Sequence, residues 1–535
     1  MIAGAGVAAA AGSLAIVGCG GGGAKRDDEE PAAGGTLRFG TSLLLSYGLD
    51  PQIESGSGLT IFPKAYGYLF HVDPRADELL LDHAASVEQP DPTTYLIRLR
   101  DDVRFHDVAP ANGRTVAADD VVRSIERYRD NPLVVNKTWH TTVLDRAETV
   151  DARTVRVTTK RPYAYSLHEL GAINAGAILP REAMDQQQSL LDGGAGSGPL
   201  IIDNVSLPSS VRLRRNDAYA GDAALVDAME WHVFASDAEK LDALRSLSID
   251  SAPMRDRREA DEAATIGIAV QLRTERSLAY LSLGLRSDRP PFGDPRVRQA
   301  IDIALDRASM IRDVAFGDAD VTGPVNPHMA EGFWSLPADE VARAQGGVIG
   351  AADRQTNARQ LLAAAGAEGA TIRIQVADQP QLVDVATVVR TQLAPAGLNV
   401  ELQTLDLLTW FVNFRRGDFD ATLISQLPYE WPDTPTRLYH SGGADGANNM
   451  FGYKDPAIDA LVERSWGEAD RRQRQATLLE AQRLMVAARP MVHLFSGMGY
   501  TATWGHVRGF PEETGSLAQY AYRQWLRVPV DGRVN

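Results

Sequence analysis

The chain has a single cysteine, Cys19, among its 535 residues. Without a second cysteine it forms no internal disulfide, no CxxC metal knuckle and no redox dithiol, so packing alone must hold the fold. Histidine is also scarce. The ten histidines do not cluster in the sequence, which disfavours a dedicated metal site, and we expect no cofactor.

Positive charge is the second deficit. The 54 Lys and Arg residues face 70 Asp and Glu residues, which gives a net charge of -16 and a pI of about 5.2. Such a chain repels nucleic acids and anionic membrane surfaces, so neither is an expected partner. The content of 44% hydrophobic and 23% charged residues is ordinary for a soluble globular protein, and the length predicts two to four domains.

Catalytic motifs are missing as well. His168-Glu169 does not begin an HExxH motif, because Ala172 stands where the second histidine is required. Ser197 lies between adjacent glycines, so it forms no GxSxG elbow, and the sequence has no Walker loop for ATP. We therefore expect that the protein is not an enzyme; a secreted hydrolase on a lipid anchor is the less favoured alternative.

The N-terminus carries the first positive signal. Residues 1–18 contain no charged side chain and end in an apolar run directly before Cys19. This pattern resembles the lipobox of bacterial lipoprotein signal peptides, in which cleavage precedes the cysteine and the thiol is lipidated; stable anchoring needs at least two acyl chains. Residues 19–35, in which four glycines follow Cys19, are expected to be a flexible tether. A transmembrane helix is disfavoured because the segment is short and rich in Ala and Gly. No basic segment precedes the apolar run, so we expect the true start to lie upstream of Met1.

Apolar alternation predicts strands in the first half of the chain, at 36–40, at 94–99 and twice within 143–158. One face of the strand 94–99 carries three apolar side chains: Tyr95, Ile97 and Leu99. The break at 193–199, rich in glycine, precedes the apolar run 200–202 and is expected to return the chain from an inserted subdomain.

Two helix starts are predicted from capping residues. Thr115 reads as an N-cap, with Asp119 and Asp120 in the first turn of the helix that follows. Asp294 reads as a second N-cap, with Pro295 at the first helical position. The position of Asp119 and Asp120 at a helix start accounts for this pair of carboxylates, so no catalytic role is assigned to them.

From residue 357 on, helices and strands alternate. The pattern predicts helices at 358–365, 381–393 and around Trp410, and strands at 371–376, 399–405 and 420–425. This spacing favours right-handed parallel units, that is, an α/β lobe. A long helix at 471–488 then precedes the short apolar strand 491–495.

Five segments in this order resemble the extracellular solute-binding proteins of family 5, the dipeptide- and oligopeptide-binding type. They are LRDDVRFHD at 99–107, TVAADDVVRSI at 115–125, GSGP at 196–199, PFGDPRVRQA at 291–300 and VRGF at 507–510. Most of these residues have structural interpretations: His106 is expected to be a hydrogen-bonded structural residue, and Arg296 and Arg298 are expected on a solvated helix face.

The resemblance implies a two-lobed α/β periplasmic-binding-protein fold (Venus flytrap), with an extra subdomain inserted in the first lobe and two hinge strands. The predicted parts are a lipoprotein signal peptide (1–18), a tether (19–35), a first lobe (36–278, with the subdomain at about 57–195), a second lobe (279–491) and a return to the first lobe (492–535). The expected crossings are 280–285 and 491–495. Closure would be a hinge motion that the ligand stabilises through contacts made only in the closed form.

The resemblance also implies where a ligand binds. In peptide-binding members an acidic residue after a second-lobe strand pairs with the peptide α-amino group, and Glu430 stands at that position. The alternative is that Glu430 is a rim carboxylate. Trp410 stands where relatives place a pocket-wall tryptophan, although a core position in its helix is the competing interpretation. Weaker candidates for ligand contact complete the set: Trp431, Tyr429, Asp433 and Tyr47.

The expected function is that of the solute-capturing lipoprotein of an ABC importer, located at the extracytoplasmic face of the cell membrane or in the periplasm. Its partners would be a small solute, most simply a peptide, and a permease with its ATPase subunits; the protein would be a monomer. Nickel chelates, sugars or opines remain alternative ligands, and a sensor role without transport remains an alternative function.

Overall fold

The computed structural model describes residues 31–42, 48–53, 60–73, 78–134, 137–173, 175–186, 190–347, 349–426, 431–443, 449–509 and 524–526. By its contacts the chain divides into Met1–Pro31 and Ala32–Asn535, and all described helices and strands belong to the second unit. Four residues with predicted roles lie outside the described residues: Cys19, Tyr47, Tyr429 and Glu430.

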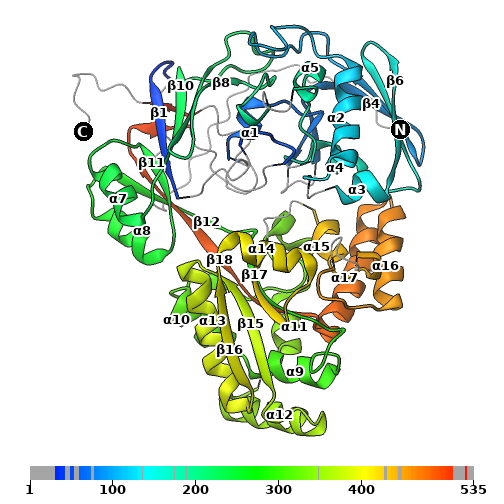
Figure 1. Ribbon diagram of the computed structural model, residues 1–535, viewed down its shortest axis with the longest axis vertical. Helices are drawn as coiled ribbons and strands as arrows, with labels where there is room; N and C mark the ends of the chain where they lie inside the picture. The colour runs from blue at the N-terminus through cyan, green and yellow to red at the C-terminus, as the bar shows by residue number, and fades with distance from the viewer. Residues whose placement is uncertain are drawn as a thin grey trace, which may run out of the picture. The chain divides into compact units, whose positions relative to one another are not determined.

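The first-lobe sheet is built around β1 (Thr36–Thr41), the strand predicted at 36–40. It pairs in parallel with β10 (Ala228–Val233) and, through Phe39, with β11 (Ser251–Met254). An antiparallel meander of β9 (Ser210–Arg215) and β8 (Leu200–Ser206) extends the sheet beyond β10. Helices α7 (Asp237–Arg245) and α8 (Arg257–Ala264) contact β11 (Figure 1).

Between β1 and β8 the chain forms a subdomain with its own antiparallel sheet. The strand order is β4 (Ala84–Asp91), β5 (Thr94–Leu99), β7 (Thr154–Thr159) and β6 (Leu144–Asp151). Three side chains of β5 are buried on one face, as the alternation predicted: Tyr95, Ile97 and Leu99. Helix α2 (Ala118–Asp130) packs on β6 and β7, and α3 (Thr138–Thr142) and α4 (Ser166–Gly171) complete the subdomain. The inserted subdomain is thereby confirmed.

Helix α2 starts two residues later than its sequence pattern indicates. Its N-cap is Ala117, whose backbone N–H donates to the Asp120 carboxylate at 2.9 Å. The predicted N-cap Thr115 instead pairs with Arg104 in an isolated β-bridge. The prediction for Thr115 was therefore wrong, because backbone pairing occupies that residue, whereas Asp120 does serve the helix start.

The second lobe has the predicted alternation of strands and helices. Parallel strands β16 (Asn399–Leu405), β15 (Thr371–Ala377) and β17 (Ala421–Gln426) lie beside the antiparallel β13 (Tyr280–Leu285). The intervening helices are α12 (Ala351–Ala364), α13 (Pro380–Leu393) and α14 (Leu407–Arg416). With α9 (Pro295–Ala304) and α10 (Arg307–Val314), the first two helices share one apolar core with this sheet. Asp294 caps α9 as predicted, accepting from the Arg296 N–H at 2.8 Å.

Two neighbouring strands connect the lobes. Strand β12 (Val270–Arg276) belongs to the first lobe and leads through residues 277–279 to β13 in the second. The long strand β18 (Met491–Trp504) pairs with β13 up to Phe495 and with β12 from Met498 on (Figure 1). The predicted crossings are thus the second-lobe ends of these strands. The part of β18 that pairs with the second-lobe strand β13 runs from Met491 to Phe495.

Three helices stand between the second-lobe sheet and the subdomain: α15 (Asp433–Arg437), α16 (Pro456–Gly467) and α17 (Arg471–Ala488), the last as predicted. Their apolar residues share a single core with those of the subdomain. The remaining described elements are α1 (Phe62–Ala65), β2 (Phe70–Asp73), β3 (Glu78–Leu81), α5 (Arg181–Met184), β14 (Ala319–Asp320), α11 (Ala338–Ala344), β19 (Val507–Arg508) and β20 (Trp525–Leu526), with short 3-10 turns at Met329–Gly332, Ala394–Ala396 and Ser441–Gly443.

Candidate functional site

Three of the predicted site residues follow the carboxyl ends of parallel strands in the second lobe. Trp410 lies on α14, which follows β16, whereas Trp431 and Asp433 follow β17. Open α/β sheets bind their ligands outside the carboxyl ends of the strands. This edge of the second-lobe sheet is therefore the candidate site.

Trp410 is half-buried, and its ring is held from two sides. The indole Nε1 donates to Thr422 Oγ1 on β17 at 3.0 Å, and the ring stacks on Phe414 one turn later, with centroids 5.4 Å apart and planes 2° from parallel. Asp406 caps the helix by accepting from the Thr409 N–H at 3.0 Å. No residue of α14 is fully buried, so Trp410 is a partly exposed, rigid ring and not a residue of the deep core.

Trp431 is 6% exposed and contacts the subdomain. Its ring centroid lies 5.8 Å from that of His168 on α4. Among the described residues its Nε1 has no hydrogen-bond partner. Buried indole N–H groups usually find an acceptor, so this donor is suited to an oxygen that comes from outside the described residues.

Asp433 is completely buried at the start of α15. Its carboxylate accepts hydrogen bonds from the Tyr163 hydroxyl of the subdomain and from Trp466 Nε1 of α16, and it forms an ion pair with Arg437 Nε at 2.7 Å. The structure thus surrounds this predicted ligand contact with protein partners. Its clearest role is to fix α15 next to the subdomain.

A second carboxylate, Glu169 on α4, completes this cluster. It accepts from Arg437 Nη2 at 2.7 Å. Burial raises the pKa of Glu169, and the Arg437 guanidinium opposes that shift. Burial disfavours the charged form of Arg437, but the neighbouring Asp433, Tyr163 and Glu169 together hold its pKa above the ordinary value. Burial also raises the pKa of Tyr163 well above its usual range, so the phenol remains a donor at neutral pH.

Sequence reasoning assigned roles to neither Glu169 nor Arg437. Glu169 was considered only as part of an incomplete HExxH pattern, and its partner lies 268 positions away. No local spacing could have revealed this pair. Glu430, Tyr429, Tyr47 and Cys19 lie outside the described residues, and their roles remain predictions.

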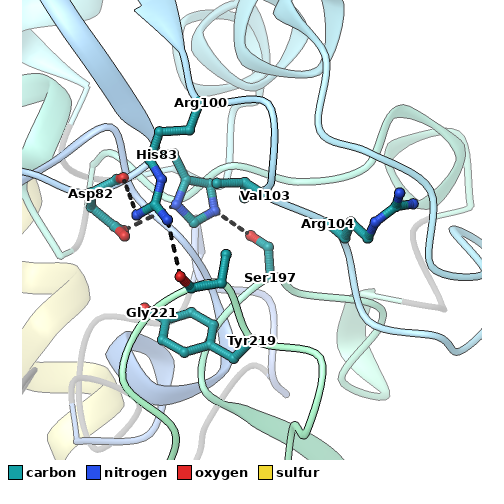
Figure 2. Close-up of a pocket in the computed structure, with 9 residues that line it drawn as sticks. Asp82, His83, Arg100, Val103, Arg104, Ser197, Tyr219 and Gly221 are labelled. Atoms are coloured by element: carbon teal, nitrogen blue, oxygen red, sulfur yellow. Dashed lines mark hydrogen bonds and ion pairs between the residues drawn. The ribbon is translucent and has the colours of Figure 1, made fainter.

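A small cavity lies where the subdomain meets the first-lobe sheet (Figure 2). It is lined by Asp82, His83, Arg100, Val103, Arg104, Ser197, Tyr219, Ala220 and Gly221. His83 Nε2 lies 2.8 Å from Ser197 Oγ, and His83 Nδ1 lies 3.2 Å from Asp82 Oδ2. These are the three residue types of a serine-hydrolase triad.

The surroundings of Ser197 give it a structural role. Only 1% of the residue is exposed, and a Cβ at Gly196 or Gly198 would lie 1.9 Å from Ala65 O or 2.5 Å from Lys64 O. The carbonyl oxygens of Ala65 and Lys64 therefore leave no room for a side chain on either side of Ser197. The triad-like contacts fasten the glycine turn by which the chain returns to the first lobe.

His106 fastens the same turn. Its Nε2 lies 3.0 Å from Gly198 O, its backbone N–H donates to Gly196 O at 2.8 Å, and burial lowers the pKa of His106 to about 4. The prediction of a hydrogen-bonded structural histidine is consistent with these contacts.

The described residues contain no group of three His, Cys, Asp or Glu side chains placed to hold a metal ion. In the same part of the chain, none of the helices combines the length and the apolar composition needed to cross a bilayer.

Comparisons with known proteins agree with this architecture. The profile of the bacterial extracellular solute-binding proteins, family 5 (middle region), matches residues 78–449. The oligopeptide-binding protein AppA of Bacillus subtilis is 23% identical over 471 residues, which covers 83% of this chain and 83% of AppA.

Solved structures show the same fold. The periplasmic binding protein DppA of Helicobacter pylori, in complex with the peptide STSA, superposes with a TM-score of 0.81 at 21% identity, covering 93% of this chain and 99% of DppA. The binding protein AgaA of A. tumefaciens R10, in complex with agropinic acid, superposes with a TM-score of 0.79 at 23% identity, covering 92% of this chain and 99% of AgaA.

Proposed function

Because the chain belongs to the bacterial extracellular solute-binding proteins, family 5, we propose that it captures a peptide between its two lobes and delivers it to an ABC permease. The family consists of non-catalytic solute-binding proteins of ABC transport, and the chain is not an enzyme. Its place is therefore extracytoplasmic.

The observation that carries the proposal is the arrangement of the second-lobe sheet. The carboxyl ends of β16 and β17 place Trp410 and Trp431 at one edge, and Glu430 directly precedes Trp431 in the sequence. The neighbouring crossings at 277–279 and 496–497 allow the first lobe to move toward that edge by hinge bending. In this proposal Glu430 binds the ligand ammonium, Trp410 and Trp431 form apolar walls, and Tyr429 and Tyr47 line the site.

A peptide is favoured because the similar proteins with assigned ligands are mostly peptide binders, among them AppA and DppA. An opine is the second candidate, since the similar AgaA structure contains agropinic acid. A carboxylate at position 430 suits the free amine of a peptide. In an opine the amine is substituted and the molecule carries additional carboxylates, which a carboxylate at position 430 would repel.

The test is a thermal-shift screen of the purified chain, followed by titration calorimetry. Di- to pentapeptides, opines, sugars and nickel chelates are compared. We expect a peptide to raise the melting temperature and to bind with a micromolar or lower Kd, without being converted. Binding of opines alone would support the second candidate, and hydrolysis of any of these compounds would contradict a binding function.

We further propose that Cys19 carries the lipid anchor. Residues 1–18 then act as the signal peptide and residues 19–35 as the tether. In cells, Cys19→Ser is expected to move the protein from the membrane fraction to the soluble fraction, as measured by fractionation and immunoblotting. An unchanged membrane association of the variant would contradict anchoring at Cys19.

A further inference from the structure

One buried contact joins the subdomain of the first lobe to the second lobe. It is formed by residues separated in the sequence by 268 to 309 positions. On the subdomain side it includes the segment from residue 161 to α4, and on the other side the helices α15, α16 and α17 (Figure 1).

Four side chains form the polar centre of this contact: Tyr163 and Glu169 from the subdomain, and Asp433 and Arg437 from α15. Tyr163 donates to Asp433, and Arg437 bridges the two carboxylates, with a nitrogen 2.7 Å from each. All four are at most 9% exposed. Each lobe thus contributes one carboxylate and one hydrogen-bond donor.

Further contacts surround this centre. The Ala164 backbone N–H donates to Trp466 O at 2.7 Å, a backbone hydrogen bond between the two lobes. The Arg474 Nε donates to the Tyr165 hydroxyl at 3.1 Å, and its guanidinium lies 5.0 Å from the centroid of the same ring. The contact is therefore specific in register as well as buried.

The chain itself connects the lobes only at 277–279 and 496–497 among the described residues. A rotation about these two segments that opens the lobes moves the subdomain away from α15. Opening the lobes must therefore break the contact between Tyr163 and Asp433 and that between Glu169 and Arg437.

The contact has an apolar part, because side chains of α15, α16 and α17 share one core with those of the subdomain, and opening it exposes that area to water. The four polar side chains at its centre behave differently. Separated carboxylates and guanidinium groups regain their hydration, so the net stabilisation from a buried ion pair is small, while its geometry remains specific. Such a contact can favour one closed arrangement without locking it permanently.

We propose that Tyr163, Glu169, Asp433 and Arg437 form an interlobe latch that stabilises the closed arrangement of the two lobes. The inference rests on the proposed function in one respect: the lobes must be able to part for a solute to enter. α15 begins two residues after Trp431, so the latch and the proposed ligand contacts share one short segment. A bound ligand that holds this segment would reinforce the latch.

The test uses the ligand-free, purified chain and the double variant Tyr163→Phe/Glu169→Gln, whose replacements are nearly isosteric. Hydrogen exchange of the peptide containing Ala164 is measured by mass spectrometry, and the radius of gyration by small-angle X-ray scattering. We expect the Ala164 amide to exchange at least tenfold faster in the variant and the radius of gyration to increase, while exchange in β5 stays unchanged.

The control is Arg343→Gln, which removes an exposed ion pair with Asp339 inside α11 and should change neither quantity. If the double variant does not fold, the single variant Tyr163→Phe, which removes one hydroxyl, should still speed exchange at Ala164. Unchanged exchange and an unchanged radius in the folded variant would overturn the latch. Since no ligand is present, failure of every candidate ligand to bind would reject the proposed function and leave this result standing.

Discussion

In the proposed function the Glu430 carboxylate binds the ligand ammonium group. If Glu430 pairs with a desolvated ammonium group, losing its charge costs about 2–5 kcal/mol, whereas a micromolar ligand is held by about 8 kcal/mol. Glu430→Gln should therefore weaken binding of the preferred ligand at least tenfold in titration calorimetry. Glu368→Gln is the matched control, because Glu368 is exposed on the same lobe. A loss of less than tenfold would show that Glu430 is not the anchor.

Buried histidines make the stability of the fold sensitive to acid. Burial lowers the pKa of His106 to about 4, and those of His140 and His493 to about 3. In the unfolded chain these groups titrate near 6.5, so below that pH the unfolded state binds more protons and the free energy of unfolding falls. The contribution of these histidines to the free energy of unfolding is complete above about pH 6.5. It is lost as the pH falls toward their pKa values in the folded state.

His140 allows this effect to be isolated. Its ring is buried and stacks on Tyr128, with centroids 4.9 Å apart, so phenylalanine can replace it with similar packing. Each such histidine lowers the free energy of unfolding by about 2 kcal/mol as the pH falls from 7 to 5. The urea unfolding free energy of His140→Phe should therefore fall by about 2 kcal/mol less than that of the wild type over this range. Parallel curves for the two proteins would contradict a neutral buried imidazole.

At the scale of the elements, most strands and helices followed from the sequence. The strand 94–99, the strand 399–405 and the helix 471–488 have the predicted bounds, because hydrophobic periodicity and flanking caps agree there. The start of α2 differed, since the backbone of Thr115 pairs with Arg104. Contacts between distant elements, such as that of Glu169 with Arg437, could not be predicted, because they produce no local pattern in the sequence.

Arg296 and Arg298 show, within one helix, that contacts with distant elements cannot be predicted from the local sequence. Both were expected on a solvated face. Arg296 is indeed exposed: it forms an ion pair with Asp294 at 2.6 Å, and its Nη1 donates to Ala364 O at 2.6 Å. Arg298 is only 5% exposed. Its Nε donates to Ala488 O at the end of α17 at 2.8 Å, and its Nη1 donates to Phe292 O at 2.6 Å. The expectation for Arg298 was wrong, because the carbonyls at a helix C-terminus attract a cation that the sequence alone does not reveal.

The two arginines therefore predict unequal effects of the same substitution. Hydrogen bonds from a charged group contribute about 1.5–3 kcal/mol each, whereas an exposed ion pair contributes about 0–1 kcal/mol. Arg298→Met should lower the free energy of unfolding by about 3 kcal/mol or more, and Arg296→Met, whose contacts are exposed to water, by about 1 kcal/mol. Urea denaturation of both variants measures the difference, and equal losses would show that burial of Arg298 adds nothing.

At the scale of the whole molecule, the two lobes depend on how their crossings are held together. The Asn326 side chain donates to Ser277 O at 3.1 Å, to Leu278 O at 2.9 Å and to Ser496 Oγ at 3.0 Å. Ser496 in turn donates to Ser277 O at 2.7 Å. Asn326 and Ser496 are each 1% exposed. One buried amide therefore ties both crossing segments into a single hinge.

Asn326→Ala should therefore affect both stability and binding, although Asn326 is not among the proposed ligand contacts. Leaving the buried carbonyls of the crossing unpaired costs about 1–3 kcal/mol of folding free energy. A looser hinge also spreads the lobes over more arrangements, so that only a fraction of molecules is competent to bind and the apparent Kd rises in inverse proportion to that fraction. We expect a Kd at least threefold higher by titration calorimetry. Asn399→Ala, which removes an exposed hydrogen bond to Gly369 O, should leave the Kd unchanged. A destabilised Asn326→Ala with wild-type Kd would mean that the ligand, and not the hinge, sets how the lobes meet.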